Sequence, residues 1–299
     1  MEKQEKYDME RLVDLAALGN RDALEELLGD VQDMVFNLSL RMLGTVPDAE
    51  DACQEILIKV MTHLSDFRKE SRFSTWVFRI AVNHVLAYRK HMFSQHPLSF
   101  EYYGEDIANG REEDVPDMTG GVDRGILEEE LKLSCTNVML QCLDGESRCI
   151  FILGTMFRLD SAVAGEILGI SPAAYRKRLS RIREKMAAFL GEYCGLAGGK
   201  CSCRRRVDYA IASRRLTPER LEYNGMEQGR SRIAEQCRDI MEEIDGQSRI
   251  FAEMPFYRTG PEAKEFIKGL LRSDAYRTVM MYKKFDPLVA AVLIMFVAV

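Results

Sequence analysis

Basic side chains are concentrated in one short segment of this 299-residue sequence, at a spacing that suits binding to nucleic acid. Residues 175–186 contain six basic side chains and one acidic side chain, Glu184, for a local charge of +5. The basic residues are Arg176, Lys177, Arg178, Arg181, Arg183 and Lys185. Arginine and lysine pair with DNA phosphates and also reach guanine edges in the major groove. A solvated basic face on a helical bundle is the alternative, since a charge run alone does not identify DNA binding.

The residues around this segment predict a helix-turn-helix that would present the basic side chains. Two apolar helix faces flank a turn, the first with Ala164, Ile167 and Leu168 and the second with Tyr175, Leu179, Ile182 and Met186. Gly169 supplies the tight turn, and Ser171 followed by Pro172 is an N-cap with proline at the first helical position. The turn, the cap and the inward periodicity together favour a second helix that enters the major groove.

A second group of side chains could hold a nucleotide that has left the base stack. Residues 67–83 combine aromatic and arginine side chains and end in an asparagine. The candidates are Arg72, Phe73, Trp76, Arg79 and Asn83. Aromatic rings can stack on an unpaired base, arginines can hold phosphates, and an amide can hydrogen-bond to a base edge. Trp76 and Phe78 also suit a hydrophobic core, so Arg79 and Asn83 are the stronger candidates.

An acidic cluster follows a break at Gly44 and Pro47. Its members are Asp48, Glu50, Asp51, Gln54 and Glu55. Carboxylates on one helix surface can pair with arginines of a partner protein, or they can simply stabilise the positive end of the helix dipole. Hydrolytic or metal chemistry is disfavoured, because no histidine or catalytic nucleophile accompanies the cluster.

The chain as a whole reads as all-α, and its charge is unevenly distributed. The formal net charge is −6, and residues 101–130 alone hold eleven acidic and two basic side chains. This stretch is also rich in glycine, so we expect a flexible linker. The remainder of the chain is therefore slightly basic, and the acidic total does not exclude DNA as a partner.

Residues 48–90 resemble region 2, and the helix-turn-helix over 161–186 resembles region 4, of bacterial RNA polymerase sigma factors of the extracytoplasmic-function (ECF) class. The resemblance implies a region 2 bundle over 8–95, a flexible acidic linker over 96–125, region 4 over 126–193 and a helical C-terminal extension over 194–299. It implies a protein, not itself an enzyme, that binds core RNA polymerase and promoter DNA and helps to melt the promoter. Independently of the resemblance, the eight cysteines and an N-terminus without the apolar stretch of a signal peptide lead us to expect a reducing cytoplasm. The alternative is a helix-turn-helix regulator that does not dock on polymerase and senses a ligand or redox state.

The resemblance also assigns roles to the three groups of residues. It implies polymerase binding by Asp48, Glu50, Asp51, Gln54 and Glu55, and −10 binding by Arg72, Phe73, Trp76, Arg79 and Asn83. It implies −35 binding by Arg176, Lys177, Arg178, Ser180 and Arg181. Tyr175 and Ala164 depart from the residues usual in the family, so base preferences do not transfer with the motif.

Three cysteines mark the start of the extension. Cys194, Cys201 and Cys203 could approach one zinc ion, with Cys237 as the nearest candidate for a fourth ligand. Redox sensing is the rival hypothesis, since arginines 204–206 would lower the pKa of a neighbouring thiol. Unliganded, reduced cysteines in a hinge are the third reading.

Beyond the hinge, apolar residues predict helices that fold onto the sigma regions and regulate them in cis, in place of or beside a separate anti-sigma protein. The final residues, Leu288 to Val299, form an apolar run that would reach only ~18 Å as a helix, short of the ~30 Å hydrocarbon core. We therefore expect no stable membrane span, and a buried or partner-docked helix is favoured over contact with a membrane surface.

Overall fold

The computed structural model describes residues 2–88, 90, 92–109, 117–228, 249–274 and 276. These residues form helices joined by short turns, with one isolated β-bridge between Gln228 and Tyr257 and no strand among the described ranges. The prediction of an all-α fold is confirmed. The apolar run 288–299 and Cys237 lie outside the described residues. No helix among the described residues combines the length and apolarity needed to cross a membrane.

The first unit is a bundle of α1 (Glu2–Ala17), α2 (Arg21–Leu43), α3 (Val46–Thr62) and α4 (Phe73–Ala87), with the short η1 (Leu64–Asp66) before α4. Local signals define its helix ends. Asn20 caps α2 by accepting from the N–H of Ala23, and Thr45 caps α3 by accepting from the N–H of Asp48. Gly44 ends α2 with a φ of 86°, a conformation that glycine adopts without steric cost.

The second unit contains α7 (Arg124–Gln141), α8 (Gly145–Phe151), α9 (Ser161–Leu168) and α10 (Pro172–Tyr193). The π-helical turn η2 (Ile152–Met156) continues α8. Gly169 has a φ of 67° after α9, and the Ser171 hydroxyl caps α10 by accepting from the N–H of Ala174. The predicted helix-turn-helix is therefore present, with its turn and cap at the expected residues.

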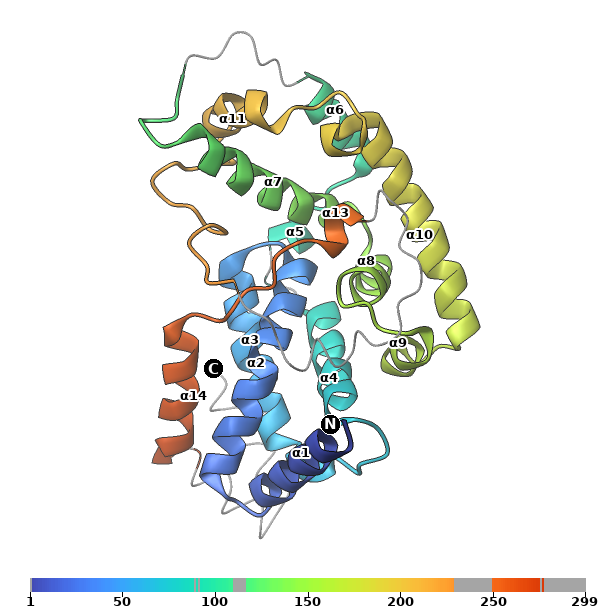
Figure 1. The fold of residues 1–299 in the computed structure, drawn as a ribbon, viewed down its shortest axis with the longest axis vertical. Helices are drawn as coiled ribbons and strands as arrows, with labels where there is room; N and C mark the ends of the chain where they lie inside the picture. Colours follow the sequence, from blue (N-terminus) through green and yellow to red (C-terminus); the bar gives the residue numbers. More distant parts are fainter. Residues whose placement is uncertain are drawn as a thin grey trace.

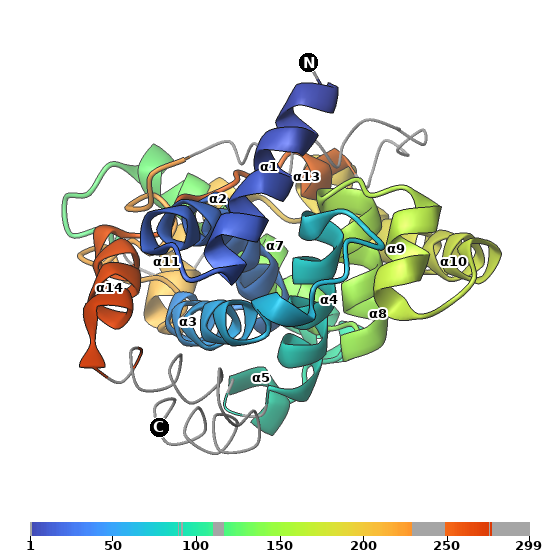
Figure 2. The same cartoon turned by 90° about the horizontal axis from the view of Figure 1, so that it is seen from below.

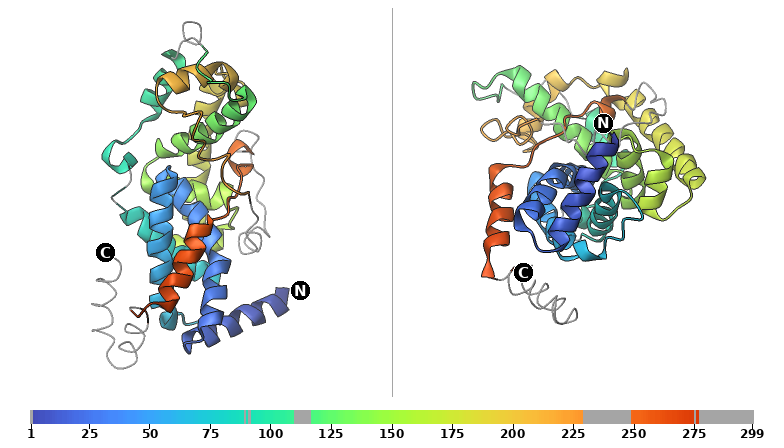
Figure 3. Two further views of the ribbon diagram at one scale, coloured as in Figure 1. Left: turned by 90° about the vertical axis from the view of Figure 1, so that its left-hand side faces the viewer. Right: turned by 60° about the horizontal axis from the view of Figure 1, so that its bottom comes forward.

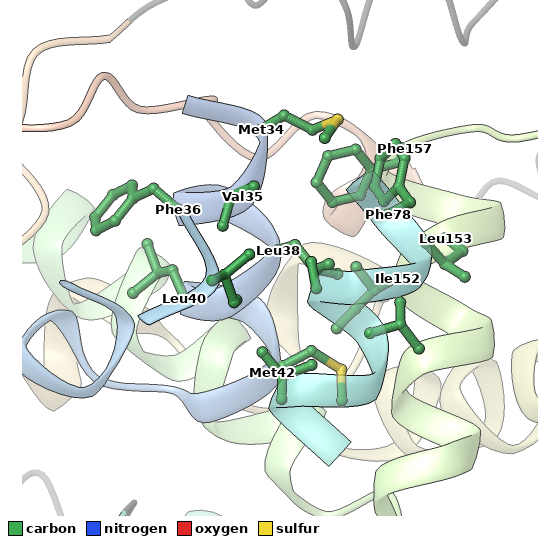
Figure 4. Close-up of a cluster of buried hydrophobic side chains, with 14 of the residues drawn as sticks. Met34, Val35, Phe36, Leu38, Leu40, Met42, Phe78, Ile152, Leu153 and Phe157 are labelled. Atoms are coloured by element: carbon green, nitrogen blue, oxygen red, sulfur yellow. The ribbon is translucent and has the colours of Figure 1, made fainter. Parts of the chain in front are cut away.

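The two units share one hydrophobic core. Helix α4 lies between α2 and the α8–η2–α9 segment (Figures 1 and 2). Phe78 of α4 meets Phe157 edge to face, with ring centroids 5.2 Å apart, and Ile152 and Leu153 of η2 pack beside them (Figure 4). All four side chains are buried. The units therefore pack directly on each other.

Part of the expected flexible linker is a docked helix. Short α5 (Met92–Gln95) is followed by α6 (Phe100–Asn109), whose Phe100 and Tyr103 rings lie 5.0 and 6.1 Å from the Phe189 ring of α10. The Tyr209 hydroxyl and the Arg206 guanidinium donate to the Asp106 carboxylate. Two aromatic residues three positions apart thus stabilise a helix inside a segment whose average composition is acidic.

The C-terminal extension folds back on both units. After η3 (Gly195–Ala197), helix α11 (Cys203–Ala212) packs on α7 in a small second core that contains Leu127 and Val207. Short α13 (Arg249–Ala252) lies against η2, and α14 (Pro261–Arg272) lies beside α2 (Figures 1 and 3). Ile267 and Leu271 form the buried face of α14.

Candidate nucleic-acid and polymerase interface

Helix α10 presents its basic face because its apolar face is anchored. Tyr175, Leu179 and Met186 are each at most 3 % exposed. The Tyr175 hydroxyl donates to the carbonyl of Ile150 at 3.0 Å, and a side chain at Gly154 would lie 2.6 Å from that hydroxyl oxygen. The large side chain of Tyr175 is thus accommodated by a glycine on the facing helix.

The basic side chains of α10 divide into tethered and untethered groups. Arg178 pairs with Glu146, and Arg176 donates to the Ser161 hydroxyl at 2.8 Å. Ser180 donates to Glu184 at 3.0 Å. Lys177 and Arg181 are exposed and have no polar partner in the part of the chain that the structure describes. These two cations are therefore ready to meet an external anion.

Arg183 lies on the basic face of α10 and also forms hydrogen bonds with η2 that stabilise the fold. It donates to the Thr155 hydroxyl at 3.3 Å and to the Gly154 carbonyl at 3.2 Å. Lys185 lies over the Phe100 ring, 4.8 Å from its centroid. Both side chains thus help to hold α10 against neighbouring elements.

A pocket of about 370 Å³ lies between α3 and α4. Its walls are Lys59, His63, Asp66, Trp76, Ile80, Asn83, His84 and Ala87. Trp76 and Asn83 are seven residues apart, two helical turns, so both point to the same face of α4. Its size suits a planar organic group, and its walls offer an indole ring, an exposed amide and the Lys59 cation.

The other −10 candidates lie differently. Phe73 is 5 % exposed, stacks with Trp76 and meets Phe67 edge to face, which gives it a supporting role beneath the pocket. Arg72 is exposed at the start of α4. Arg79 pairs with Glu166 of α9 at 2.9 Å, away from the pocket walls. The structure therefore joins Trp76 and Asn83 in one site and leaves Phe73 and Arg79 outside it.

Sequence reasoning missed Lys59, His63 and His84. Lys59 and His63 are one helical turn apart near the end of α3, beyond the acidic cluster that drew attention. Lys59 Nζ lies 2.6 Å from His84 Nδ1. Burial and the adjacent Lys59 ammonium lower the pKa of His84 to about 4. His84 is therefore neutral near pH 7, which leaves Lys59 as the cation at this wall.

The acidic cluster on α3 has an inner and an outer part. Asp48 accepts from the Thr45 hydroxyl at 2.7 Å and belongs to the helix cap. Gln54 and Glu55 are half-buried, and Glu55 lies 3.5 Å from His84 and 3.7 Å from Lys90. A histidine of α4 therefore does accompany the cluster, which the sequence did not indicate because His84 is 29 positions from Glu55. Glu50 and Asp51 are exposed. Although Glu50 is exposed, partial desolvation of its carboxylate, with smaller contributions from Glu262 and Asp51, raises its pKa. The outward charge of the cluster therefore comes mainly from Glu50 and Asp51.

The hinge cysteines form a compact turn. The N–H of Cys201 donates to the Tyr193 carbonyl at 3.0 Å, and the N–H of Gly199 donates to the Cys194 carbonyl at 2.8 Å. Among the described residues, no three histidine, cysteine, aspartate or glutamate side chains gather in a way that could hold a metal ion. Burial raises the pKa of the Cys203 thiol, so the expectation that adjacent arginines lower it is wrong for this residue.

Comparisons with known proteins agree with this arrangement. The family model for Sigma-70 region 2 matches residues 27–91. The chain is 28 % identical over 173 residues to the ECF RNA polymerase sigma factor SigW of Bacillus subtilis, covering 56 % of this chain and 89 % of that protein. It is 28 % identical over 179 residues to the RNA polymerase sigma factor CnrH of Cupriavidus metallidurans, covering 58 % and 90 %.

A further relative has a higher percentage identity over a shorter stretch. The RNA polymerase sigma factor NccH of Alcaligenes xylosoxydans xylosoxydans is 31 % identical over 144 residues, which cover 48 % of this chain and 73 % of that protein. The matched region 2 residues include all of α3 and α4, with the pocket between them. On these grounds the chain belongs to the RNA polymerase sigma factors of the ECF class.

Proposed function

We propose that this sigma factor divides promoter recognition among three surfaces. The outer carboxylates of α3 bind core RNA polymerase, the α3–α4 pocket receives a −10 base, and α10 contacts the −35 element. The observation that carries the proposal is that one chain contains two different surfaces suited to nucleic acid. One is a helix with untethered cations, which suits duplex phosphates and guanine edges, and the other is a base-sized pocket.

The pocket proposal makes a specific chemical claim. Trp76 offers a ring on which an unstacked base can lie, and Asn83 offers both a donor and an acceptor to its exposed edge. Lys59 supplies a positive charge for the adjacent phosphate. Capture of a flipped base would then stabilise the melted strand, since the energy of unstacking is offset by contacts that only the open form makes.

Separate variants test the three surfaces. Asn83→Ala should reduce promoter opening, measured by permanganate reactivity of unpaired thymines, while polymerase binding stays unchanged. Leu86→Ala, an exposed residue on the same helix and outside the pocket, is the matched control. Asp51→Lys should weaken binding to core polymerase. Equal opening by Asn83→Ala and Leu86→Ala would exclude the pocket as the base-binding site.

A regulator that acts without polymerase is the less favoured function. It would need only the helix-turn-helix, and it leaves the α3–α4 pocket and the matched region 2 without a role. We propose no catalytic step for the chain.

Zinc binding by Cys194, Cys201 and Cys203 stays a prediction that depends on Cys237, outside the described residues. The compact turn that joins Cys194 to Cys201 supports proximity of two thiols. The lack of a ligand group among the described side chains speaks against a site formed without Cys237. Metal analysis of protein purified under reducing conditions tests it, and less than about a tenth of an equivalent of zinc would exclude the site.

A further inference from the structure

Three polar side chains on one face of α2, which we call the stripe, form hydrogen bonds with the backbone of the C-terminal extension. Asp33, Asn37 and Arg41 are spaced four residues apart and therefore lie on one face of the helix. The Arg41 guanidinium donates to the Pro255 carbonyl at 2.7 Å. The Asn37 amide donates to the Tyr257 carbonyl at 2.6 Å and accepts from the Tyr257 N–H at 2.9 Å.

The third member of the stripe completes the pattern. Asp33 Oδ1 accepts from both the N–H and the hydroxyl of Thr259, at 2.9 and 3.0 Å. Four helical residues rise about 6.0 Å, and two extended residues span about 6.6 Å. Side chains at every fourth position of α2 therefore match alternate residues of an extended segment running the opposite way. We call residues 251–259, which comprise the end of α13 and this extended segment, the strap.

The strap also binds the second unit. Phe251 is buried against Phe151 of α8, with ring centroids 5.1 Å apart, and Phe256 lies 6.1 Å from Phe157 after η2. Both contacts are edge to face. The strap crosses α2 between α14 and α13 (Figure 1). It thus joins the bundle that carries the −10 pocket to the unit that carries the −35 helix.

The first unit, with the α3–α4 pocket, and the second unit, with α10, are here called the reading units. While they are in contact, which we call the closed arrangement, they cannot bind the −10 and −35 elements of one promoter at the same time. Helices α4 and α9 are in direct contact, and Arg79 pairs with Glu166 across them. The −35 and −10 positions are about 25 base pairs apart, or ~85 Å of B-form DNA at ~3.4 Å per base pair. Units that touch cannot span this distance, so the units must separate before both elements are bound.

The burial of the contacts between the two units shows which of them hold the closed arrangement together. The side chains of the Arg79–Glu166 pair are 43 % and 44 % exposed, and surface ion pairs of this kind contribute little to stability. The stripe is different, because Arg41 and Asn37 are each 2 % exposed and Tyr257 is fully buried. Buried polar groups lose more when a partner leaves. The strap, the shared core and the buried contact of Arg148 in α8 with the Met42 carbonyl of α2 are therefore the main restraints.

We propose that the strap is a built-in inhibitor that holds the two reading units together, and that its release is required for promoter binding. This inference rests on the proposed division of promoter recognition. It gives the extension a defined inhibitory contact and predicts that loosening residues 251–259 raises activity.

The first test uses the full chain with substitutions that weaken the contacts of the strap with α2 and with the second unit. Phe256→Ser with Thr259→Pro removes one aromatic contact and the two donors to Asp33, without altering α2. Phe256→Leu with Thr259→Ser keeps an apolar side chain and both donors and is the matched control. The release variant should have a larger maximum dimension in X-ray scattering. It should give at least about fivefold more promoter-specific transcript with core polymerase than the control. Unchanged dimension, or expansion without more transcript, would overturn the proposal.

The second test closes the strap by oxidation and does not depend on the release variant folding. Asp33→Cys with Thr259→Cys places two thiols at the end of the stripe. Oxidation should suppress transcription, and a reductant should restore it, relative to each single variant treated in the same way. Full activity of the oxidised double variant would refute the strap as an inhibitor.

Failure of the underlying function gives a different result. If neither the wild-type chain nor the release variant is retained on immobilised core polymerase, the proposed polymerase binding and the strap inference both fail. Retention of both, with equal transcription, overturns the strap alone.

Discussion

Replacing Arg148 by methionine removes the side chain that ties the end of α2 to the end of α7. Arg148 is 7 % exposed and donates to four backbone carbonyls. The acceptors are Leu140 at 3.0 Å, Gln141 at 3.3 Å, Leu143 at 2.8 Å and Met42 at 2.5 Å. Burial lowers the pKa of Arg148 to about 10, so it still carries its charge near neutral pH.

The size of the effect follows from these contacts. A hydrogen bond from a charged donor contributes about 1.5–3 kcal/mol, and a buried carbonyl left without a partner costs about 1–3 kcal/mol. Leu140 keeps a second partner, since it also accepts from the N–H of Leu143. Removing a buried charge returns part of its desolvation cost. We therefore expect a net loss of about 3 kcal/mol, or roughly 6–12 °C in Tm for a domain of this size.

Thermal and urea unfolding followed by circular dichroism measures the loss. Arg178→Met is the matched control, because Arg178 is 46 % exposed and pairs only at the surface with Glu146. The control should change stability by less than about 0.5 kcal/mol. If Arg148→Met lost less than about 1 kcal/mol, or no more than the control, the backbone contacts of Arg148 would not hold the two units together as described.

Three further changes have defined outcomes. Burial and the Lys59 ammonium lower the pKa of His84 to about 4, so between about pH 4 and 6.5 the unfolded chain binds more protons than the folded chain. The free energy of unfolding should therefore rise with pH across this window, by up to ~1.4 kcal/mol per pH unit. His84→Gln should flatten this rise when unfolding is measured by urea titration at each pH. Glu130, 3 % exposed, accepts from the Tyr223 N–H at 2.9 Å; Glu130→Gln should cost about 2 kcal/mol and speed hydrogen exchange at Tyr223. Lys177→Ala should weaken binding to all DNA sequences alike and reduce the slope of log affinity against log salt by about 1.

Each of these predictions has a result that counts against it. A stability profile of His84→Gln that still rises as in the wild type would assign the pH dependence to other groups. Unchanged exchange at Tyr223 in Glu130→Gln would mean that the Glu130 carboxylate does not hold the backbone N–H of Tyr223. A loss of affinity confined to one promoter sequence would make Lys177 a base-reading residue instead of a phosphate contact.

The helix-turn-helix could be predicted because its signals are local. Gly169 at the turn and Ser171 at the cap act within a few residues, and both are found in the expected roles. The helix after the break at Gly44 begins at Val46, two residues before the acidic helix start that the sequence indicated at Asp48. Nucleic-acid candidates on α10 followed from charge, but the sequence did not separate tethered Arg178 from untethered Lys177. That distinction depends on Glu146, far away in the chain.

The features that sequence reasoning missed are non-local. Docking of α6 depends on contacts of the Phe100 and Tyr103 rings with Phe189 of α10. The acidic composition of the segment predicted a flexible linker and gave no indication of these contacts. The α3–α4 pocket needs Lys59 of α3 to face α4 across the bundle. The stripe of Asp33, Asn37 and Arg41 pairs with residues more than 200 positions away. Such contacts follow from tertiary packing, which periodicity within one helix does not encode.

The most direct test of the central claim is transcription by purified core RNA polymerase from a library of promoter fragments, with and without this protein. The wild-type chain and the strap-release variant should direct initiation from a subset of fragments. These fragments should share sequences near −35 and −10, and the release variant should give the larger yield. Binding to core polymerase without any fragment-specific transcript from either protein would contradict the assignment of promoter recognition to this chain.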